Sequence, residues 1–181
     1  MSFRIALVGS GAIGSYYGAK LAYGAAEFTR GGVQCTVVKN LALERWRKLV
    51  WNVPFNGLSI LAGGIDTGAI LQDKDLRDTT LGLMNEVIEI ANKCGQLLEH
   101  AAANQQIKRT EKMAAYKPST LLDWEGGRPF EIEPIWGAPL RRATAVGANV
   151  PRLEVVYALL KYLGEAERRE KSAAKIAGHS S

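Results

Sequence analysis

Three glycines near the amino terminus have the spacing of a loop that binds the phosphates of a dinucleotide. In the pattern GxGxxG the first glycine permits a tight turn and the second lets the backbone approach a pyrophosphate. The third lets the following helix pack on the preceding strand, and the phosphate lies at the positive end of that helix. The spacing, together with a predicted strand before it and a predicted helix after it, favours dinucleotide binding over an ordinary glycine-rich turn. The loop is made of Gly9, Ser10, Gly11, Ala12, Ile13 and Gly14.

A lysine and two asparagines, spaced by four residues, form a second candidate site at Lys48, Asn52 and Asn56. On a helix they share one stripe with Arg45 and Ser59. The rest of the segment is mainly large and apolar, which is typical of a buried helix, so the stripe must face either partners or a cleft. One ammonium and two amides in a cleft would suit a substrate oxygen. Polar groups satisfied by neighbouring backbone, or a stripe facing solvent, fit the spacing equally well.

The elements predicted around the glycine loop are those of a nucleotide-binding domain. Residues 4–8 form a short apolar run typical of a buried strand, and residues 15–23 are helical in pattern. Residues 33–38 are β-branched and alternating, which predicts a second strand. A GxGxxG loop between a strand and a helix is the context that dinucleotide binding requires. The acid or arginine expected at the end of a second strand about 20 residues later is missing.

From Asn40 onward the patterns are helical. Asn40 is a predicted N-cap for the helix that carries the polar stripe, with a kink at Pro54. Further helices are expected over residues 79–94, 99–115 and 130–146, and a last one from Pro151. Residues 118–127, with Ser119, are predicted to be a turn-rich link. We expect domains at 1–38 and 39–165 and a tail at 166–181, which makes the fold class α/β plus all-α.

Composition excludes several classes of function. The formal net charge of +5 at pH 7 is dispersed among carboxylates, so we expect no nucleic-acid partner. Two distant cysteines and two distant histidines form no metal-ligating motif, so no metal is expected. The sequence contains no uninterrupted apolar run of membrane-spanning length. A cytoplasmic protein is therefore predicted.

Two segments resemble the ketopantoate reductase (2-dehydropantoate 2-reductase) family. They are RIALVGSGAIGSYYGAKLA at the start and LALERWRKLVWNVPFNGLSIL around Lys48. The family's catalytic-helix motif is a lysine with asparagines four and eight residues later, which matches Lys48, Asn52 and Asn56. The segment STLLDWEGGRPFEIE resembles the family's Ser…Asp…Glu segment and places Ser119 and Glu131 on its functional positions.

The resemblance implies an enzyme of pantothenate biosynthesis that uses NADPH to reduce 2-dehydropantoate to pantoate. Lys48 would be the catalytic proton donor, and the substrate would be bound by Asn52, Asn56 and Ser119. Glu131 would contact the substrate hydroxyl or the nicotinamide ribose, and the glycine loop would hold the pyrophosphate. Glu86 would either support Lys48 or be a surface carboxylate of its helix.

The sequence departs from the family between Gly24 and Ala25. Family members have most of their nucleotide-binding domain there, on the order of a hundred residues by the six-strand plan of such domains. Residues 25–38 resemble the last helix and strand of that domain. A lone strand and helix cannot make a sheet, so we predict a break in the chain between Tyr23 and Glu27. The alternative is a true deletion.

Two other functions remain open at this point. A deleted remnant could act without catalysis, as a helical module that dimerises or binds a partner. A reductase of a related 2-keto acid would carry the same residues. The sequence leaves the oligomeric state undecided between a monomer and a homodimer.

Overall fold

The computed structural model describes the backbone of residues 40–113 and 115–177, and the side chains as far as Ala166. The chain divides into two compact units, Met1–Lys48 and Leu49–Ser181, of which the first is described only from Asn40. The described residues contain helices and no strand, which confirms the helical part of the predicted fold class. The predicted strands, the glycine loop and the predicted break near Gly24 lie outside the described residues.

Helix α3 (Leu41–Leu61) begins where the sequence predicts. The Leu43 backbone N–H donates a 3.1 Å hydrogen bond to Asn40 Oδ1, which confirms the N-cap. The helix continues through Pro54 to Leu61, and every residue from Val53 to Ile60 is buried. The turn that follows Leu61 contains Gly63 and Gly64, whose φ angles of 87° and 89° favour glycine.

Two capping aspartates start the next two helices. Asp66 accepts a hydrogen bond from the Ala69 N–H before α4 (Thr67–Gln72), and Asp73 accepts one from Leu76 before α5 (Lys74–Lys93). The helix predicted from residue 79 therefore begins five residues earlier, because Asp73 supplies the cap that the apolar pattern does not reveal. Gly95 follows α5 with a φ of 77°, as expected for a glycine after a helix end.

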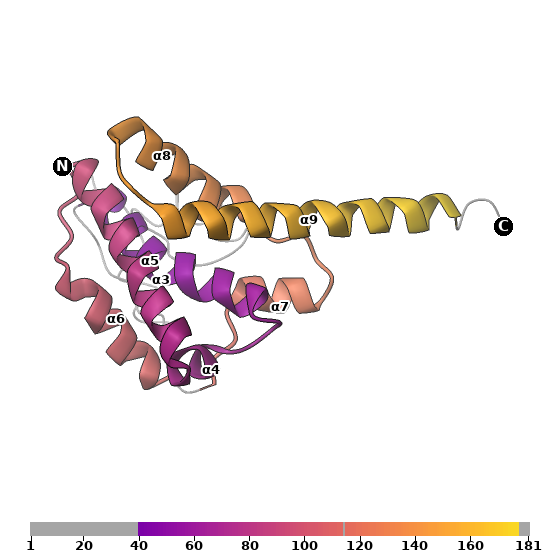
Figure 1. The fold of residues 1–181 in the computed structure, drawn as a ribbon, viewed down its shortest axis with the longest axis horizontal. Coiled ribbons are helices and arrows are strands. Elements are labelled where there is room, and N and C mark those ends of the chain that lie inside the picture. Colours follow the sequence, from indigo (N-terminus) through magenta and orange to yellow (C-terminus); the bar gives the residue numbers. More distant parts are fainter. Residues whose placement is uncertain (1–39, 114, 178–181) are drawn as a thin grey trace, which may run out of the picture. The chain divides into compact units, whose positions relative to one another are not determined.

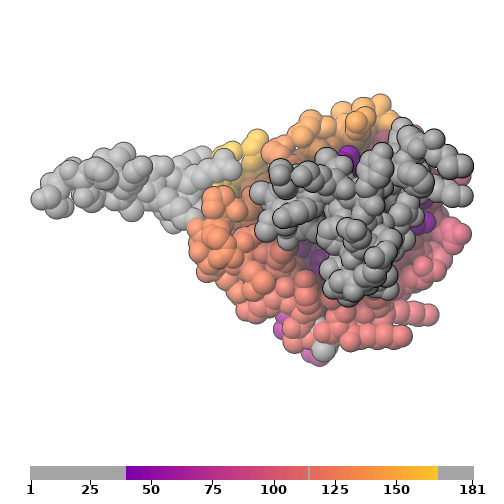
Figure 2. Space-filling model, turned by 180° about the vertical axis from the view of Figure 1, so that it is seen from behind, coloured from indigo at the N-terminus to yellow at the C-terminus, as the bar shows by residue number. Residues whose placement is uncertain are grey.

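The polar, alanine-rich segment forms α6 (Ala101–Glu111), which is shorter than predicted. Atoms in the pink-to-salmon colours of this helix are visible on the face shown in Figure 2. Its exposed residues include Asn104, Gln105 and Lys108. The link predicted over residues 118–127 is wrong in part, because α7 (Ser119–Glu125) is a helix. Turn-forming residues mark only the ends of α7, while Leu121 within it is fully buried.

The helix predicted from residue 130 begins as a π-helical turn, η2 (Glu133–Gly137), and continues as α8 (Ala138–Val146). The last helix, α9 (Pro151–Ala177), buries Leu153, Val156 and Leu160. It runs through most of the segment expected to be a tail. That segment is rich in Ala, Glu, Lys and Arg, which are strong helix formers.

Helix α5 lies at the centre of the second unit and packs against α4, α6, α8 and α9 (Figure 1). Its buried residues are Thr80, Leu83, Met84, Glu86, Val87, Ile88, Ile90 and Ala91. No helix among the described residues is both long and apolar enough to cross a membrane.

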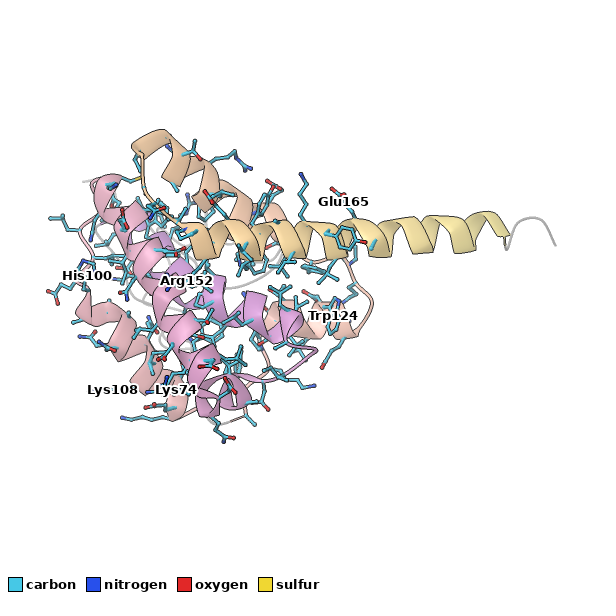
Figure 3. All side chains as sticks on the ribbon, in the orientation of Figure 1. Lys74, His100, Lys108, Trp124, Arg152 and Glu165 are labelled. Carbon is cyan, nitrogen blue, oxygen red and sulfur yellow. The ribbon has the colours of Figure 1, made fainter. Side chains whose placement is uncertain are left out.

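Glu86 is the one buried carboxylate of α5, and it caps another helix. Its side chain is only 7% exposed, so of the two alternatives the surface carboxylate is wrong. Its carboxylate accepts hydrogen bonds from the backbone N–H groups of Arg152 (3.1 Å) and Leu153 (2.9 Å) and from the Arg152 guanidinium (3.3 Å). Figure 3 shows Arg152 at the start of α9, beside α5. Because the first N–H groups of a helix have no partner within it and Val150 has no capping side chain, Glu86 supplies that partner.

Glu86→Ala is expected to lower the free energy of unfolding by about 2–3 kcal/mol, because it leaves two helix-terminal N–H groups without an acceptor. Urea denaturation followed by circular dichroism measures this. Glu89→Ala on the same helix is the matched control, since Glu89 forms an exposed ion pair with Lys93 and should cost less than about 1 kcal/mol. Equal losses in the two variants would contradict the capping role.

Candidate active site

The polar stripe of α3 passes from solvent into the interior. Lys48 is exposed, Asn52 is half-buried, Asn56 is 2% exposed and Ser59 is fully buried. The helix is continuous across all four residues, so the intervals of four, four and three keep their side chains on one side of it. The stripe is therefore not a solvent-facing row of polar groups, at least from Asn56 onward.

Two oxygens of this stripe, Asn56 Oδ1 and Ser59 Oγ, are buried and have no hydrogen-bond partner in the part of the chain that the structure describes. Leaving a buried polar group unpaired costs about 1–3 kcal/mol. The alternative in which neighbouring backbone satisfies the stripe is therefore wrong for these two atoms. An unpaired amide oxygen and an unpaired hydroxyl on one stripe suit a ligand that itself carries hydrogen-bonding groups.

Two tryptophans hold α3 on either side of the stripe. The Trp51 indole N–H donates to Thr110 Oγ1 of α6 at 2.9 Å, and the Trp136 indole N–H of η2 donates to the Val53 carbonyl at 2.9 Å. A Cβ at Gly57 would lie 3.2 Å from the Trp136 indole nitrogen, so glycine there permits the close approach. These contacts fix the backbone at Val53, between the two asparagines of the motif.

Ser119 lies at the start of α7, and Glu131 lies beyond the loop that follows this helix. Ser119 is the first residue of α7 and is exposed. Arg128 holds this loop against the end of α7. Its side chain donates hydrogen bonds to Asp123 Oδ1 at 2.9 Å and to the Leu122 carbonyl at 3.1 Å. Glu131 is exposed and lines a pocket of about 270 Å³ whose walls also include Phe130, Ile132, Glu133, Pro134, Lys161, Gly164 and Glu165.

The structure does not join these two residues to the asparagines by hydrogen bonds. Neither Asn52 nor Asn56 lines the pocket at Glu131, and within the described residues no hydrogen bond links them to Ser119 or Glu131. A cleft with Lys48 and the two asparagines on one side, and Ser119 and Glu131 on the other, stays a prediction.

A second polar cluster beside that pocket was not expected from the sequence. The Tyr157 hydroxyl of α9 donates to Glu133 Oε1 at 2.6 Å, and Arg141 of α8 pairs with Glu133 Oε2 at 2.6 Å. The hydrogen bond from Tyr157, followed by that from Arg141, lowers the pKa of the Glu133 carboxyl. The same hydrogen bond raises the pKa of the Tyr157 phenol. Spacings of 8 and 24 residues across three elements leave no sequence signal for such a cluster.

Tyr157→Phe is expected to raise the pKa of Glu133 towards the ordinary value of a glutamate, because it removes the largest cause of the lowering. In the wild type a lowered pKa stabilises the folded state above the ordinary pKa of Glu, and the contribution is lost as the pH falls through the lowered pKa. An NMR titration of the Glu133 carboxyl carbon measures both values. Arg141→Ala should give a smaller rise, and an unchanged pKa in the Tyr157 variant would refute the assignment.

The described helices match known proteins in sequence. The family profile described as "Ketopantoate reductase PanE/ApbA C terminal" matches residues 40–164. A 2-dehydropantoate 2-reductase from Nostoc sp. is 34% identical over 142 residues, which are 78% of this chain and 44% of that protein. Another from Mesorhizobium japonicum is 30% identical over 139 residues, 77% of this chain and 42% of that protein. The chain thus spans less than half the length of these two curated relatives.

The same similarity holds in three dimensions. The crystal structure of 2-dehydropantoate 2-reductase from Methylococcus capsulatus has a TM-score of 0.75 and 36% identity, covering 79% of this chain and 46% of that one. The enzyme of the same name from Geobacter metallireducens gives a TM-score of 0.75 and 36% identity, with coverages of 80% and 48%. A D-mandelate dehydrogenase structure, at 20% identity and a TM-score of 0.71, is similar in fold alone.

Proposed function

The chain belongs to the ketopantoate reductase family, and from this premise we propose that it supplies the helical, substrate-binding part of an NADPH-dependent 2-dehydropantoate 2-reductase. The observation that carries the proposal is the Asn56 amide oxygen, which is buried and unpaired on the same helix face as Asn52. An enzyme that binds a hydroxylated keto acid needs such acceptors, since a buried polar site is costly unless a ligand completes it.

Each residue of the motif has a distinct role in the proposed reaction. Lys48 donates the proton to the developing alkoxide and stabilises its charge. Asn52 and Asn56 orient the oxygens of the substrate, and Ser119 binds its carboxylate. These groups supply position and electrostatics to a chemistry that belongs to the cofactor.

Two parts of the chain would hold the cofactor, the glycine loop and Glu131. The glycine loop from Gly9 to Gly14 would bind the pyrophosphate. The Glu131 carboxylate is exposed at its pocket and makes no hydrogen bond within the described residues, so it fits a ribose hydroxyl donor. When bound, NADPH supplies the hydride for the keto carbon. A cytoplasmic location for this reaction stays a prediction.

A second candidate function is a non-catalytic helical module that dimerises or binds a partner. Three apolar residues of α9 favour it, because Val155, Leu159 and Tyr162 are 58%, 49% and 67% exposed. Their intervals of four and three place them on one face of the helix. A reductase for a related 2-keto acid is a third candidate, since it would use the same residues.

Titration calorimetry of the purified chain with 2-dehydropantoate and with pantoate separates the proposed function from the non-catalytic module. The proposal predicts saturable binding that Asn56→Leu abolishes, because leucine has the same number of side-chain heavy atoms, branched at the same position, and lacks the amide. Asn104→Leu, on the exposed face of α6, is the matched control and should bind as the wild type does. A chain that binds neither acid, and that sediments as a dimer dissociated by Leu159→Lys, would support the module instead.

A further inference from the structure

Ser59 is a buried serine whose hydroxyl makes no hydrogen bond to any described residue. A serine inside a helix commonly donates to the carbonyl four residues earlier, which here is that of Phe55. Among the described residues Ser59 Oγ makes neither this bond nor any other, although the residue is fully buried. The Ser59 carbonyl, in contrast, accepts two hydrogen bonds, from the backbone N–H groups of Gly64 and Ile65.

The position of Ser59 places its hydroxyl beside Asn56. Residues three apart on a helix are surface neighbours, and these two lie about 4.5 Å apart along the axis. Each Cα–Cβ bond tilts towards the helix N-terminus, so the Ser59 side chain leans towards Asn56. Two unpaired buried oxygens therefore belong to neighbouring side chains of α3.

The chemistry of the pair selects one kind of group. Asn56 Oδ1 can only accept a hydrogen bond, whereas the Ser59 hydroxyl can donate one. A ligand hydroxyl can do both in return, since it has one donor and two acceptor positions. A carboxylate or keto oxygen could accept from Ser59 and would leave Asn56 Oδ1 unpaired.

We propose that Ser59 is a specificity residue that, together with Asn56, binds the alcohol group of a hydroxylated 2-keto acid. The proposal rests on the proposed function and adds a residue outside the Lys48, Asn52 and Asn56 motif. Ser59 donates to the ligand oxygen, and the ligand hydroxyl proton is donated to Asn56 Oδ1. Substrates without that hydroxyl leave both protein oxygens unpaired.

Calorimetric titration of wild type and Ser59→Ala with two acids tests the proposal. The acids are 2-dehydropantoate and its analogue with hydrogen in place of the terminal hydroxyl. Ser59→Ala is expected to weaken binding of 2-dehydropantoate about five- to tenfold, as for the loss of one hydrogen bond, and to leave affinity for the analogue unchanged. Its Tm should stay the same or rise, because the change removes an unpaired buried hydroxyl and introduces a better helix former.

Thr80→Val is the matched control, since Thr80 Oγ1 is also buried and unpaired but lies on α5. It should leave the affinity for both acids unchanged. Equal affinity of Ser59→Ala and wild type for 2-dehydropantoate would overturn the Ser59 assignment alone. Equal weakening for both acids, or a lowered Tm, would overturn it in favour of a structural role. A wild-type chain that binds neither acid would overturn the proposed function, and the Ser59 assignment with it.

Discussion

Lys48→Ala is expected to lower kcat by about 10²- to 10⁴-fold in a protein that carries a complete nucleotide-binding domain, with NADPH affinity nearly unchanged. The reason is a division of roles. The glycine loop from Gly9 to Gly14 would hold the pyrophosphate, and Lys48 would take no part in that contact. Lys48 instead would donate a proton and stabilise charge as the carbonyl becomes an alkoxide. The loss should therefore fall on kcat, with KM also changing if the ammonium binds the ground state.

The exposed position of Lys48 separates catalysis from stability. Substitution of an exposed residue usually changes the free energy of unfolding by less than about 0.5 kcal/mol, so the variant should fold. Arg47→Ala is the matched control, because Arg47 is the preceding residue, is also exposed and pairs with Glu44. Steady-state kinetics with a parallel cofactor titration measure both effects. Turnover of the Lys48 variant within about tenfold of wild type is too large for a lost catalytic acid and would end the assignment.

The sequence predicts the local features of the fold well because their signals are local. Asn40 caps α3, Gly95 follows α5 and Pro151 begins α9, each as its residue type indicates. Short helices were harder to predict. The residues that bound α7, Pro118 and Gly126, are typical of turns, and a seven-residue helix has too few apolar positions to show a period.

Contacts between distant residues could not be predicted from spacing. Glu86 contacts the start of α9 some 66 residues later, and its sequence neighbours give no sign that it is buried. The polar stripe of α3 was predictable as a periodicity on a buried helix, but which of its polar groups have partners was not. Only the packing around Asn56 and Ser59 reveals that their oxygens lack partners. A single cleft that contains Lys48, Ser119 and Glu131 stays a prediction.

Trp136 should carry the largest share of stability of any single side chain around the stripe. It is fully buried in the π-helical turn, and its indole N–H donates to the Val53 carbonyl of α3. Trp136→Ala is expected to lower the free energy of unfolding by about 3–5 kcal/mol, since a large buried ring is replaced by a cavity. Trp136→Phe keeps most of the ring and loses the hydrogen bond, so about 1–2 kcal/mol should be lost.

Urea denaturation of the two variants measures these losses, and Trp124→Ala on the half-buried surface of α7 is the control with a smaller expected loss. Ligand binding gives a second readout. Because Trp136 contacts α3 between Asn52 and Asn56, loosening this contact should weaken keto-acid binding even in Trp136→Phe, in which the core remains filled. A phenylalanine variant with full affinity and full stability would mean that ring volume alone positions α3. The hydrogen bond to Val53 would then have no part in shaping the stripe.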